Sequence, residues 1–529
     1  MFYDNIENMT IMNKIKSIIL VLIGLFIYTG CGDSFMNRID QTSINTSSFY
    51  KSESDAIKSV NAVYAPMQNI SLWGRRIHFL LDFSCDEIDP TPNTQGPPQE
   101  LIQHTFGPVG NEHIDEPWRA FYRIISKANI TIKNVGIMDD ALFTTPGMKT
   151  RVLAEAKFLR ALAYFYINAI WNGGPLRTEE NDTEISVARS SASEIWAQVE
   201  KDLVEAKNAL PLSYPQADLG RVTKGAAQAL LGRTYLYQQK WSLAETELMG
   251  VINSGEYYLM GGPDDPAGQA TTVEEAIVAM RKNHDFGVKN IGETVFEVQF
   301  SAGLGGLSWN SGAETGRQES TIRPHEYGVD GRSFYNSKPS ANLIAAYGGT
   351  GTGIGERDPR VEAFYFTEND FLDNGSTPYA TIFATSGYAW KKYQDGNFVS
   401  TGNDNDCNHD VIRYADVILM AAEAKIQQDK VNEGIELINQ IRRRADPTGA
   451  IVPERATGAS KAQAIDWLIL ERRLELSGEQ VRRLDLVRWG IAKDVIPTFQ
   501  VGKHEYFPIP QSEINANKEM TDADQNPGY

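Results

Sequence analysis

Cysteine, histidine and basic residues are scarce in this chain, and each scarcity excludes a class of protein. The three cysteines, Cys31, Cys85 and Cys407, are spread over 529 residues. They are too few and too scattered for a disulfide framework or a cysteine zinc site. Seven histidines are present, none of them in an H-E-x-x-H pattern. The 50 basic residues face 68 acidic ones, a net charge of −18. Because such a charge repels a phosphate backbone, nucleic acid is not an expected partner.

The sequence also lacks a hydrophobic run long enough to span a membrane. The apolar stretch 17–28 is shorter than the roughly 20 residues that a spanning helix needs. Lys14 and Lys16 precede it, and Gly30-Cys31 follows, a layout that resembles a bacterial lipoprotein signal. We therefore expect residues 1–31 to be a signal peptide that ends at a lipidated Cys31. The alternative is a buried hairpin or an uncleaved anchor. The Ser/Thr/Asn-rich residues 32–51 are expected to form a tether.

Amphipathic helices are predicted through the first half of the chain. Apolar residues recur every three or four positions in the segments 53–67, 118–132, 152–170 and 195–210. Ser52 opens the first helix, Pro117 precedes the second, and Ser191 with Glu194 forms a capping box before the fourth. Since each apolar stripe covers one face only, every helix must pack on a neighbour. The predicted fold class is mainly α.

Two helix pairs match the spacing of a tetratricopeptide repeat. Leu231-Gly232-Arg233-Thr234-Tyr235 has the L-G-x-x-Y core, and Ala244 follows at the position that this repeat uses. Ala422 and Gly434 repeat the spacing in a weaker copy, with Lys425 where an aromatic residue is usual. We predict a tetratricopeptide-like scaffold of helical hairpins, which typically docks proteins. The spacing alone is equally compatible with simple packed hairpins.

Helical periodicity fades between residues 256 and 409, where glycines and aromatic residues are interspersed. Loops of this kind present side chains from a rigid scaffold. We therefore predict one domain, 52–529, with helical scaffold segments 52–255 and 410–529. Between them lies a large irregular, loop-rich insertion, 256–409, that faces the ligand.

Acidic clusters are the only candidates for catalysis. Asp82, Asp86, Glu87 and Asp89 include enough carboxylates for a glycosidase pair, although such clusters are more often solvated or ion-paired. Asp404 and Asp406 suggest calcium, but they lack the loop glycine and the bidentate glutamate of a calcium loop. No catalytic residue, metal or cofactor is predicted.

A second charged run, 471–488, has the spacing of helical ion pairs. Glu479 lies three and four positions before Arg482 and Arg483, and Arg482 lies three before Asp485. We interpret this network as structural.

Eight segments, taken in chain order, carry a resemblance to a known family. They are Glu155-Ala156-Lys157-Phe158-Leu159-Arg160-Ala161, Asn172-Gly173-Gly174-Pro175-Leu176, Arg221-Val222-Thr223-Lys224-Gly225-Ala226-Ala227, Ile412-Arg413-Tyr414-Ala415-Asp416-Val417, Glu471-Arg472-Arg473-Leu474-Glu475-Leu476, Asp485-Leu486-Val487-Arg488-Trp489-Gly490, Pro508-Ile509-Pro510 and Gln525-Asn526-Pro527-Gly528-Tyr529. Together they resemble the SusD/RagB family of surface glycan-binding lipoproteins, and the resemblance spans almost the whole chain after the signal. Gln480 is a departure, because the family usually has glycine after the residue that matches Glu479.

The resemblance implies a lipid-anchored protein of the outer membrane and cell surface. It also implies that the protein is a lid on a SusC-like TonB-dependent transporter. Such a lid protein captures oligosaccharides and catalyses no reaction. Its motifs belong to the scaffold, so candidate binding residues come from physical reasoning. Sugar rings lay their C–H faces on aromatic rings, and their hydroxyls bind planar polar groups. The candidates are Trp309 with Asn310, Trp73 with Arg75, Tyr335 with Asn336, and Trp390. For each aromatic residue, a place in the core is the open alternative.

The predicted function is therefore non-catalytic binding of oligosaccharides or polysaccharides and their delivery to the transporter. Two alternatives remain at this point. A peptide- or protein-capturing lipoprotein would use the same scaffold with a cleft of backbone donors and charges. A surface glycoside hydrolase would use the Asp82 to Asp89 cluster.

Overall fold

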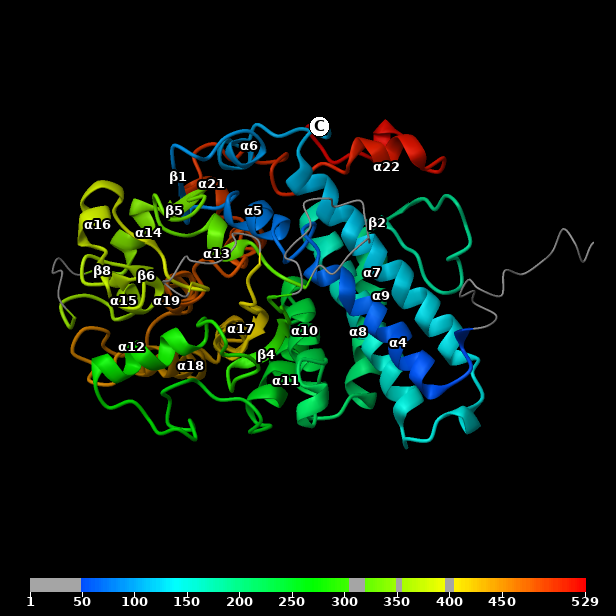
Figure 1. Cartoon of the computed structure of the whole chain (residues 1–529), viewed down its shortest axis with the longest axis horizontal. Coiled ribbons are helices and arrows are strands. Elements are labelled where there is room, and N and C mark those ends of the chain that lie inside the picture. The colour runs from blue at the N-terminus through cyan, green and yellow to red at the C-terminus, as the bar shows by residue number, and fades with distance from the viewer. Residues whose placement is uncertain (1–48, 304–318, 349–353, 395–403) are drawn as a thin grey trace, which may run out of the picture. The chain divides into compact units, whose positions relative to one another are not determined.

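The computed structural model describes residues 49–303, 319–348, 354–394 and 404–529. Residues from Ser52 to Tyr529 form one compact unit. Helices dominate this unit, and the strands are short and paired two by two (Figure 1). The mainly α fold class is confirmed. The proposed signal, including Cys31, and the insertion residues Trp309 and Asn310 lie outside the described ranges.

The helices of the first half pack in series, each on the one before it in the chain. α7 contacts α8, α8 contacts α9, α9 contacts α10 and α10 contacts α11, while α4 lies against α7 and α8 (Figure 1). As predicted, Ser52 caps α4, and Ser191 with Glu194 forms the capping box of α9. The bounds are α4 (Glu53–Tyr64), α7 (Glu112–Gly136), α8 (Met148–Trp171), α9 (Ala192–Ala209), α10 (Lys224–Tyr237) and α11 (Trp241–Ile252).

One predicted boundary was wrong. The second helix begins at Glu112 rather than after Pro117, because the Asn111 side chain accepts a hydrogen bond from the His113 backbone N–H and caps it. Pro117 lies inside the helix.

The second half of the chain completes the same helical body. α17 packs on both α10 and α11, so the two scaffold segments are one unit in space. A Cβ added to Gly232 would lie 2.6 Å from Leu248 Cγ, and one added to Gly434 would meet Ile426. These glycines therefore permit close helix approach in both predicted pairs. The helices are α17 (Tyr414–Gln427), α18 (Val431–Ala445), α19 (Lys461–Glu475), α20 (Arg482–Arg488), α21 (Ala492–Val495) and α22 (Gln511–Ala516).

The insertion contains more regular structure than its sequence indicated. Its longest helix, α12 (Val273–Lys282), starts at a Thr272–Glu275 capping box. β4 (Thr294–Val298) pairs antiparallel with β10 (His409–Arg413). Ile412, where the sequence predicted a returning helix, is therefore in a strand. The other helices are α13 (Arg323–Glu326), α14 (Ala341–Ala346), α15 (Arg360–Phe364) and α16 (Ala380–Ser386).

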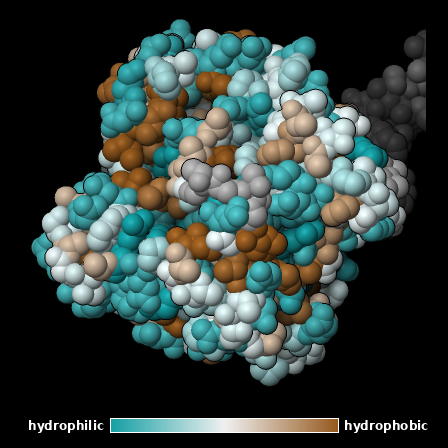
Figure 2. Space-filling model, turned by 90° about the vertical axis from the view of Figure 1, so that its left-hand side faces the viewer, coloured by the Kyte–Doolittle hydropathy of each residue, from teal (hydrophilic) through white to brown (hydrophobic). Residues whose placement is uncertain are grey.

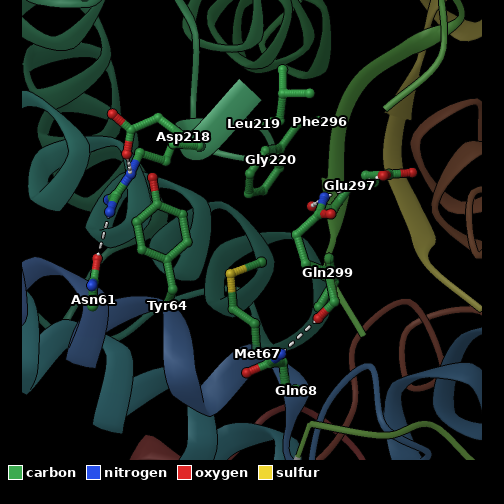
Figure 3. Close-up of a pocket in the computed structure, with 13 residues that line it drawn as sticks. Asn61, Tyr64, Met67, Gln68, Asp218, Leu219, Gly220, Phe296, Glu297 and Gln299 are labelled. Carbon is green, nitrogen blue, oxygen red and sulfur yellow. Dashed lines mark hydrogen bonds and ion pairs between the residues drawn. The ribbon is translucent and has the colours of Figure 1, made fainter. Parts of the chain in front are cut away.

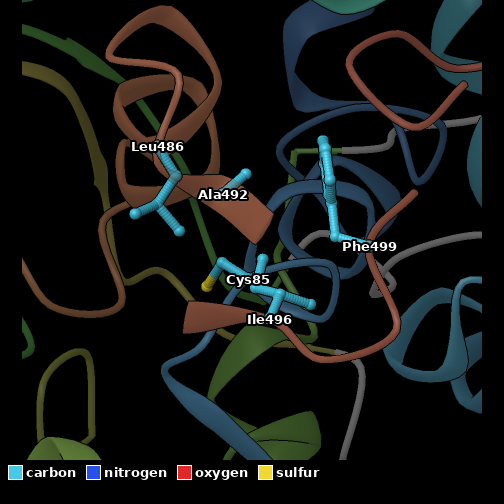
Figure 4. Close-up of a cluster of buried hydrophobic side chains, with 5 residues drawn as sticks. All are labelled: Cys85, Leu486, Ala492, Ile496 and Phe499. Atoms are coloured by element: carbon cyan, nitrogen blue, oxygen red, sulfur yellow. The ribbon is translucent and has the colours of Figure 1, made fainter. Parts of the chain in front are cut away.

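Short elements before α7 link the insertion to the end of the chain. β1 (Ile88–Pro90) pairs with β5 (Ser337–Pro339), and α5 (Arg76–Asp82) packs on α20. Figure 4 shows Cys85 among side chains of α20, α21 and the following loop, namely Leu486, Ala492, Ile496 and Phe499. Burial raises the pKa of the Cys85 thiol well above its ordinary value. This cysteine is consequently a core residue.

The charged run near the end of the chain is structural, but its pairing differs from the prediction. Glu479 pairs with Arg413 at 2.8 Å and Lys392 at 2.7 Å, and Arg482 pairs with Asp86 at 2.8 Å. Residues 476–481 are not helical, and Gly478 and Gln480 have φ of +69° and +61°. The helical spacing that the prediction used between Glu479 and Arg482 or Arg483 does not exist there.

Within the described ranges, no helix combines the length and the apolar character needed to cross a membrane. Figure 2 looks onto the end of the unit that carries α12 and α16, and shows hydrophobic patches among hydrophilic ones. Val278 on α12 and Phe371 are each 57% exposed. Exposed apolar side chains are thus present outside the core.

Candidate functional site

Three of the predicted aromatic platforms are core residues. Trp73, Tyr335 and Trp390 are 1%, 3% and 1% exposed. Trp73 makes edge contacts with the rings of Phe121 and Tyr166. Buried rings have no open face for a sugar, so the prediction that these three residues bind sugar was wrong. They are core residues. The sequence around a single aromatic residue does not show whether its ring will be buried or exposed.

The polar partners predicted beside these aromatics do converge. Arg75 Nε lies 2.5 Å from Glu326 Oε1, and Asn336 Nδ2 donates to the other oxygen of the same carboxylate. Arg75 also lies 3.7 Å from Glu112. The four residues Arg75, Glu112, Glu326 and Asn336 are called the Arg75 cluster. The side chains of Arg75 and Glu112 are 15% and 47% exposed, so the cluster opens to solvent on one side.

A loop after β1 holds the segment just before β5, which carries Asn336. Thr91 and Thr94 hydroxyls donate to the carbonyls of Tyr335 and Asn336, both at 2.6 Å. Asn93 Nδ2 donates to the Phe334 carbonyl at 3.0 Å. These bonds fix the backbone at Tyr335, which has a φ of +47°. The amide of Asn336 is consequently presented in one orientation.

Phe334 is the exposed aromatic residue beside the Arg75 cluster, and the sequence reasoning missed it. Its side chain is 42% exposed, and its ring lies 4.6 Å from that of His325 in an edge arrangement of 86°. Burial lowers the pKa of His325, so the imidazole stays neutral near pH 7. An exposed ring beside amide and carboxylate groups suits a ligand with an apolar face and hydroxyls.

The described residues that flank 304–318 and 395–403 come together next to this cluster. The Gly74 carbonyl accepts from the Ile322 backbone N–H at 3.1 Å. Asp404 Oδ1 accepts from the Gly303 N–H at 3.0 Å and from the Ser320 hydroxyl at 2.8 Å. Asp404 thus serves as a hydrogen-bond acceptor. In the described part of the chain, no group of three or more His, Cys, Asp or Glu side chains is arranged to hold a metal ion.

The acidic cluster after α5 is not an open carboxylate pair. Asp82 is buried and accepts from the Tyr327 hydroxyl at 2.9 Å. Asp86 pairs with Arg482 at 2.8 Å, and although burial opposes it, this arginine lowers the pKa of Asp86. Glu87 is 1% exposed, and burial raises its pKa to about 8. These groups are closed off from a substrate and have a structural role. The hydrolase alternative was therefore wrong.

Two family models and several curated proteins are similar to this chain. A family model described as "SusD family" matches residues 292–498, and one described as "Starch-binding associating with outer membrane" matches residues 98–236. A SusD-like protein from Formosa agariphila is 27% identical over 98% of this chain and 100% of its own.

Solved structures show the same fold. A SusD superfamily protein from Bacteroides vulgatus has a TM-score of 0.75 at 24% identity, covering 91% of this chain and 100% of its own. A laminarin-binding SusD-like protein has a TM-score of 0.69 at 26% identity, with the same coverage of 91% and 100%. The last of these is described as a binding protein, in agreement with a protein that performs no catalysis.

Proposed function

The chain belongs to the SusD/RagB family, and on this premise we propose that it binds oligosaccharides or polysaccharides through the Arg75 cluster and the exposed ring of Phe334. The observation that carries the proposal is the convergence of Arg75 and Asn336 on the carboxylate of Glu326, with the exposed Phe334 ring against the neighbouring His325. Guanidinium, amide and carboxylate groups together offer donors and acceptors for neighbouring hydroxyls. Trp309 and Asn310 remain predicted ligand contacts.

The family model described as "associating with outer membrane" supports an outer-membrane location. We further propose that Cys31 carries the lipid anchor at the cell surface, after a signal at 1–31 and before a tether at 32–51. The domain 52–529 then delivers the glycan to a SusC-like TonB-dependent transporter.

Calorimetric titration of the full chain in detergent tests the binding proposal. The panel contains laminarin, starch, other plant polysaccharides and microbial polysaccharides, and released reducing ends are measured in the same samples. We expect binding to one member without cleavage, weakened by Phe334→Ala and by Asn336→Ala. Phe371→Ala, at another exposed phenylalanine, is the matched control and leaves the affinity unchanged.

Three results would contradict the proposal. Release of reducing ends would restore the hydrolase alternative. Binding that neither variant weakens would move the site away from the Arg75 cluster. Silence across the panel, together with binding of peptides, would favour the peptide-capturing alternative.

A further inference from the structure

A second recess lies between the first helix of the scaffold and strand β4. One cavity, of about 220 Å³, is bounded by α4 and the short helix η1 (Ala65–Gln68) on one side and by β4 on the other. Figure 3 shows Tyr64 and Met67 facing Phe296 and Gln299 across it. A second cavity, of about 300 Å³, shares Leu219, Gly220, Arg221, Phe296 and Glu297 with the first. Because the two cavities share residues of the 219–221 loop and of β4, they are neighbours, and we call them together the β4 groove.

The charge of Arg221 in this groove is already neutralised by the protein. Its guanidinium lies 3.0 Å from Glu155 and 2.8 Å from Asp218, and it donates to Asn61 at 2.9 Å. Figure 3 shows two of these partners, Asn61 and Asp218, at the edge of the cavity. Among the described residues that line the groove, Arg221 is the only arginine or lysine. An anionic ligand therefore has no cation to bind there.

Two consecutive tyrosines line the second cavity, each seated on a glycine. A Cβ at Gly292 would lie 2.1 Å from Tyr258 Cζ, so the ring rests directly on that backbone. A Cβ at Gly225 would lie 2.4 Å from the Tyr257 hydroxyl oxygen, which also pairs with Thr223 at 2.9 Å. Tyr258 is half-buried and lines the cavity. A ring that is supported on one side and accessible on the other is a platform for an apolar ligand face.

Amide and carboxylate groups lie around these rings. Asn290 and Gln299 exchange two amide hydrogen bonds, both of 3.1 Å, which fixes the orientation of both side chains. The Gln68 amide donates to the Gln299 carbonyl at 2.7 Å. Glu256 is exposed at the rim. The groove therefore combines fixed amides and a carboxylate with tyrosine rings.

We propose that the β4 groove is a second saccharide-binding site, which takes a neutral oligosaccharide with one ring stacked on Tyr258. The inference rests on the proposed function for the ligand class, but it uses none of the residues of the Arg75 cluster. Rings with apolar C–H faces fit the tyrosines, and hydroxyls fit the amides and the carboxylate. A neutral ligand also fits a groove whose only guanidinium is neutralised. Two sites on one chain hold a long glycan more tightly than either site alone.

The test measures stoichiometry and affinity with laminarihexaose and with maltohexaose on the full chain in detergent. The variants are Tyr258→Ala, Tyr258→Phe, Phe334→Ala and the double variant, with Tyr506→Ala as a control tyrosine outside the groove. Circular dichroism melting confirms that each variant is folded. We expect two molecules of one hexasaccharide per chain. Tyr258→Ala then removes one binding event, Phe334→Ala weakens the other, and Tyr258→Phe keeps both within about threefold.

The outcomes separate the two proposals. One binding event that Phe334→Ala weakens and Tyr258→Ala leaves unchanged overturns the groove and preserves the proposed function. One event lost in Tyr258→Ala and unchanged in Phe334→Ala preserves the groove and overturns the Arg75 cluster. Absence of binding by both hexasaccharides overturns the groove, while the polysaccharide panel still decides the proposed function. An extended hexapeptide that binds and is lost in Tyr258→Ala, with the saccharides silent, overturns the saccharide assignment.

Discussion

The Arg413 network and the Arg75 cluster use the same side-chain types in opposite ways. Arg413 lies 2.6 Å from Glu293, 2.9 Å from Glu475 and 2.8 Å from Glu479, and its side chain is 1% exposed. In the Arg75 cluster, one partner carboxylate, Glu112, is 47% exposed.

In the enclosed network, the arginines hold the carboxylate of Glu475 in its ionised form. Burial alone would raise the pKa of Glu475, but the charges of Arg444 and Arg413 lower it to about 2. In a fully enclosed network of this kind each charge depends on its partners, since no water compensates it. A cluster that opens to solvent retains capacity for a ligand. Residue type alone therefore does not distinguish a structural arginine from a binding one.

The largest effect is expected from breaking the enclosed network. Arg413→Ala leaves Glu293, Glu475 and Glu479 with too little positive charge, and removing one partner of a buried pair costs about 3–5 kcal/mol. Urea unfolding measures the loss. Arg443→Ala, which removes an arginine that is 41% exposed, is the control and changes the stability by less than about 1 kcal/mol. Equal losses of unfolding free energy in both variants would contradict the contrast between enclosed and exposed arginines.

A second effect depends on pH and tests the buried acid next to Asp86. The carboxyl of Glu87 has an ordinary pKa of 4.5, which burial raises to about 8 in the folded chain. Between these values only the folded state keeps the proton, so stability falls by about 1 kcal/mol per pH unit as pH rises. Glu87→Gln cannot ionise, and the variant therefore gains stability relative to the parent from pH 5 to pH 8. Urea unfolding across that range checks this, and a difference that is constant with pH would contradict it.

A smaller effect is expected at Gln480, the departure from the family pattern. Its Nε2 and its backbone N–H both donate to buried Asp82, and its φ is +61°. Gln480→Gly relieves the left-handed backbone but leaves Asp82 without the side-chain donor. Asp82 keeps the Tyr327 hydroxyl and the backbone N–H of residue 480 as donors. The loss is therefore one hydrogen bond to a carboxylate, which outweighs the relieved strain by about 1 kcal/mol. Gln480→Ala, which lacks the donor and keeps the strain, should be less stable than the glycine variant in the same melts.

The smallest effect on stability is expected on the open side of the comparison. Phe334→Ala removes a ring that is 42% exposed, so the free energy of unfolding should change by less than about 0.5 kcal/mol. Its glycan affinity should nevertheless fall two- to tenfold, the range of about 0.5–1.5 kcal/mol for one aromatic contact. Calorimetry and urea unfolding on the same preparation separate the two quantities. A large stability loss would show that the ring belongs to the core.

The sequence by itself determined the mainly α class, the joining of both scaffold segments and the structural nature of the 471–488 charges. Helix periodicity, capping residues such as Ser191 with Glu194, and close-contact glycines are local signals, and local signals are read directly from the chain. Arg75 and Asn336 were chosen from the sequence for their chemistry, whereas their meeting on one carboxylate is a product of the fold.

Only the tertiary structure decided which side chains are exposed and which charges pair. Trp73 and Trp390 became core residues, whereas Phe334 and Tyr258 reached the surface, because packing partners from distant segments cover some rings and leave others open. Glu479 pairs with Arg413, 66 positions away in the chain, and not with its near neighbours, because the helix ends at Glu475. Burial and long-range pairing are properties of the folded chain, so no spacing in the sequence records them.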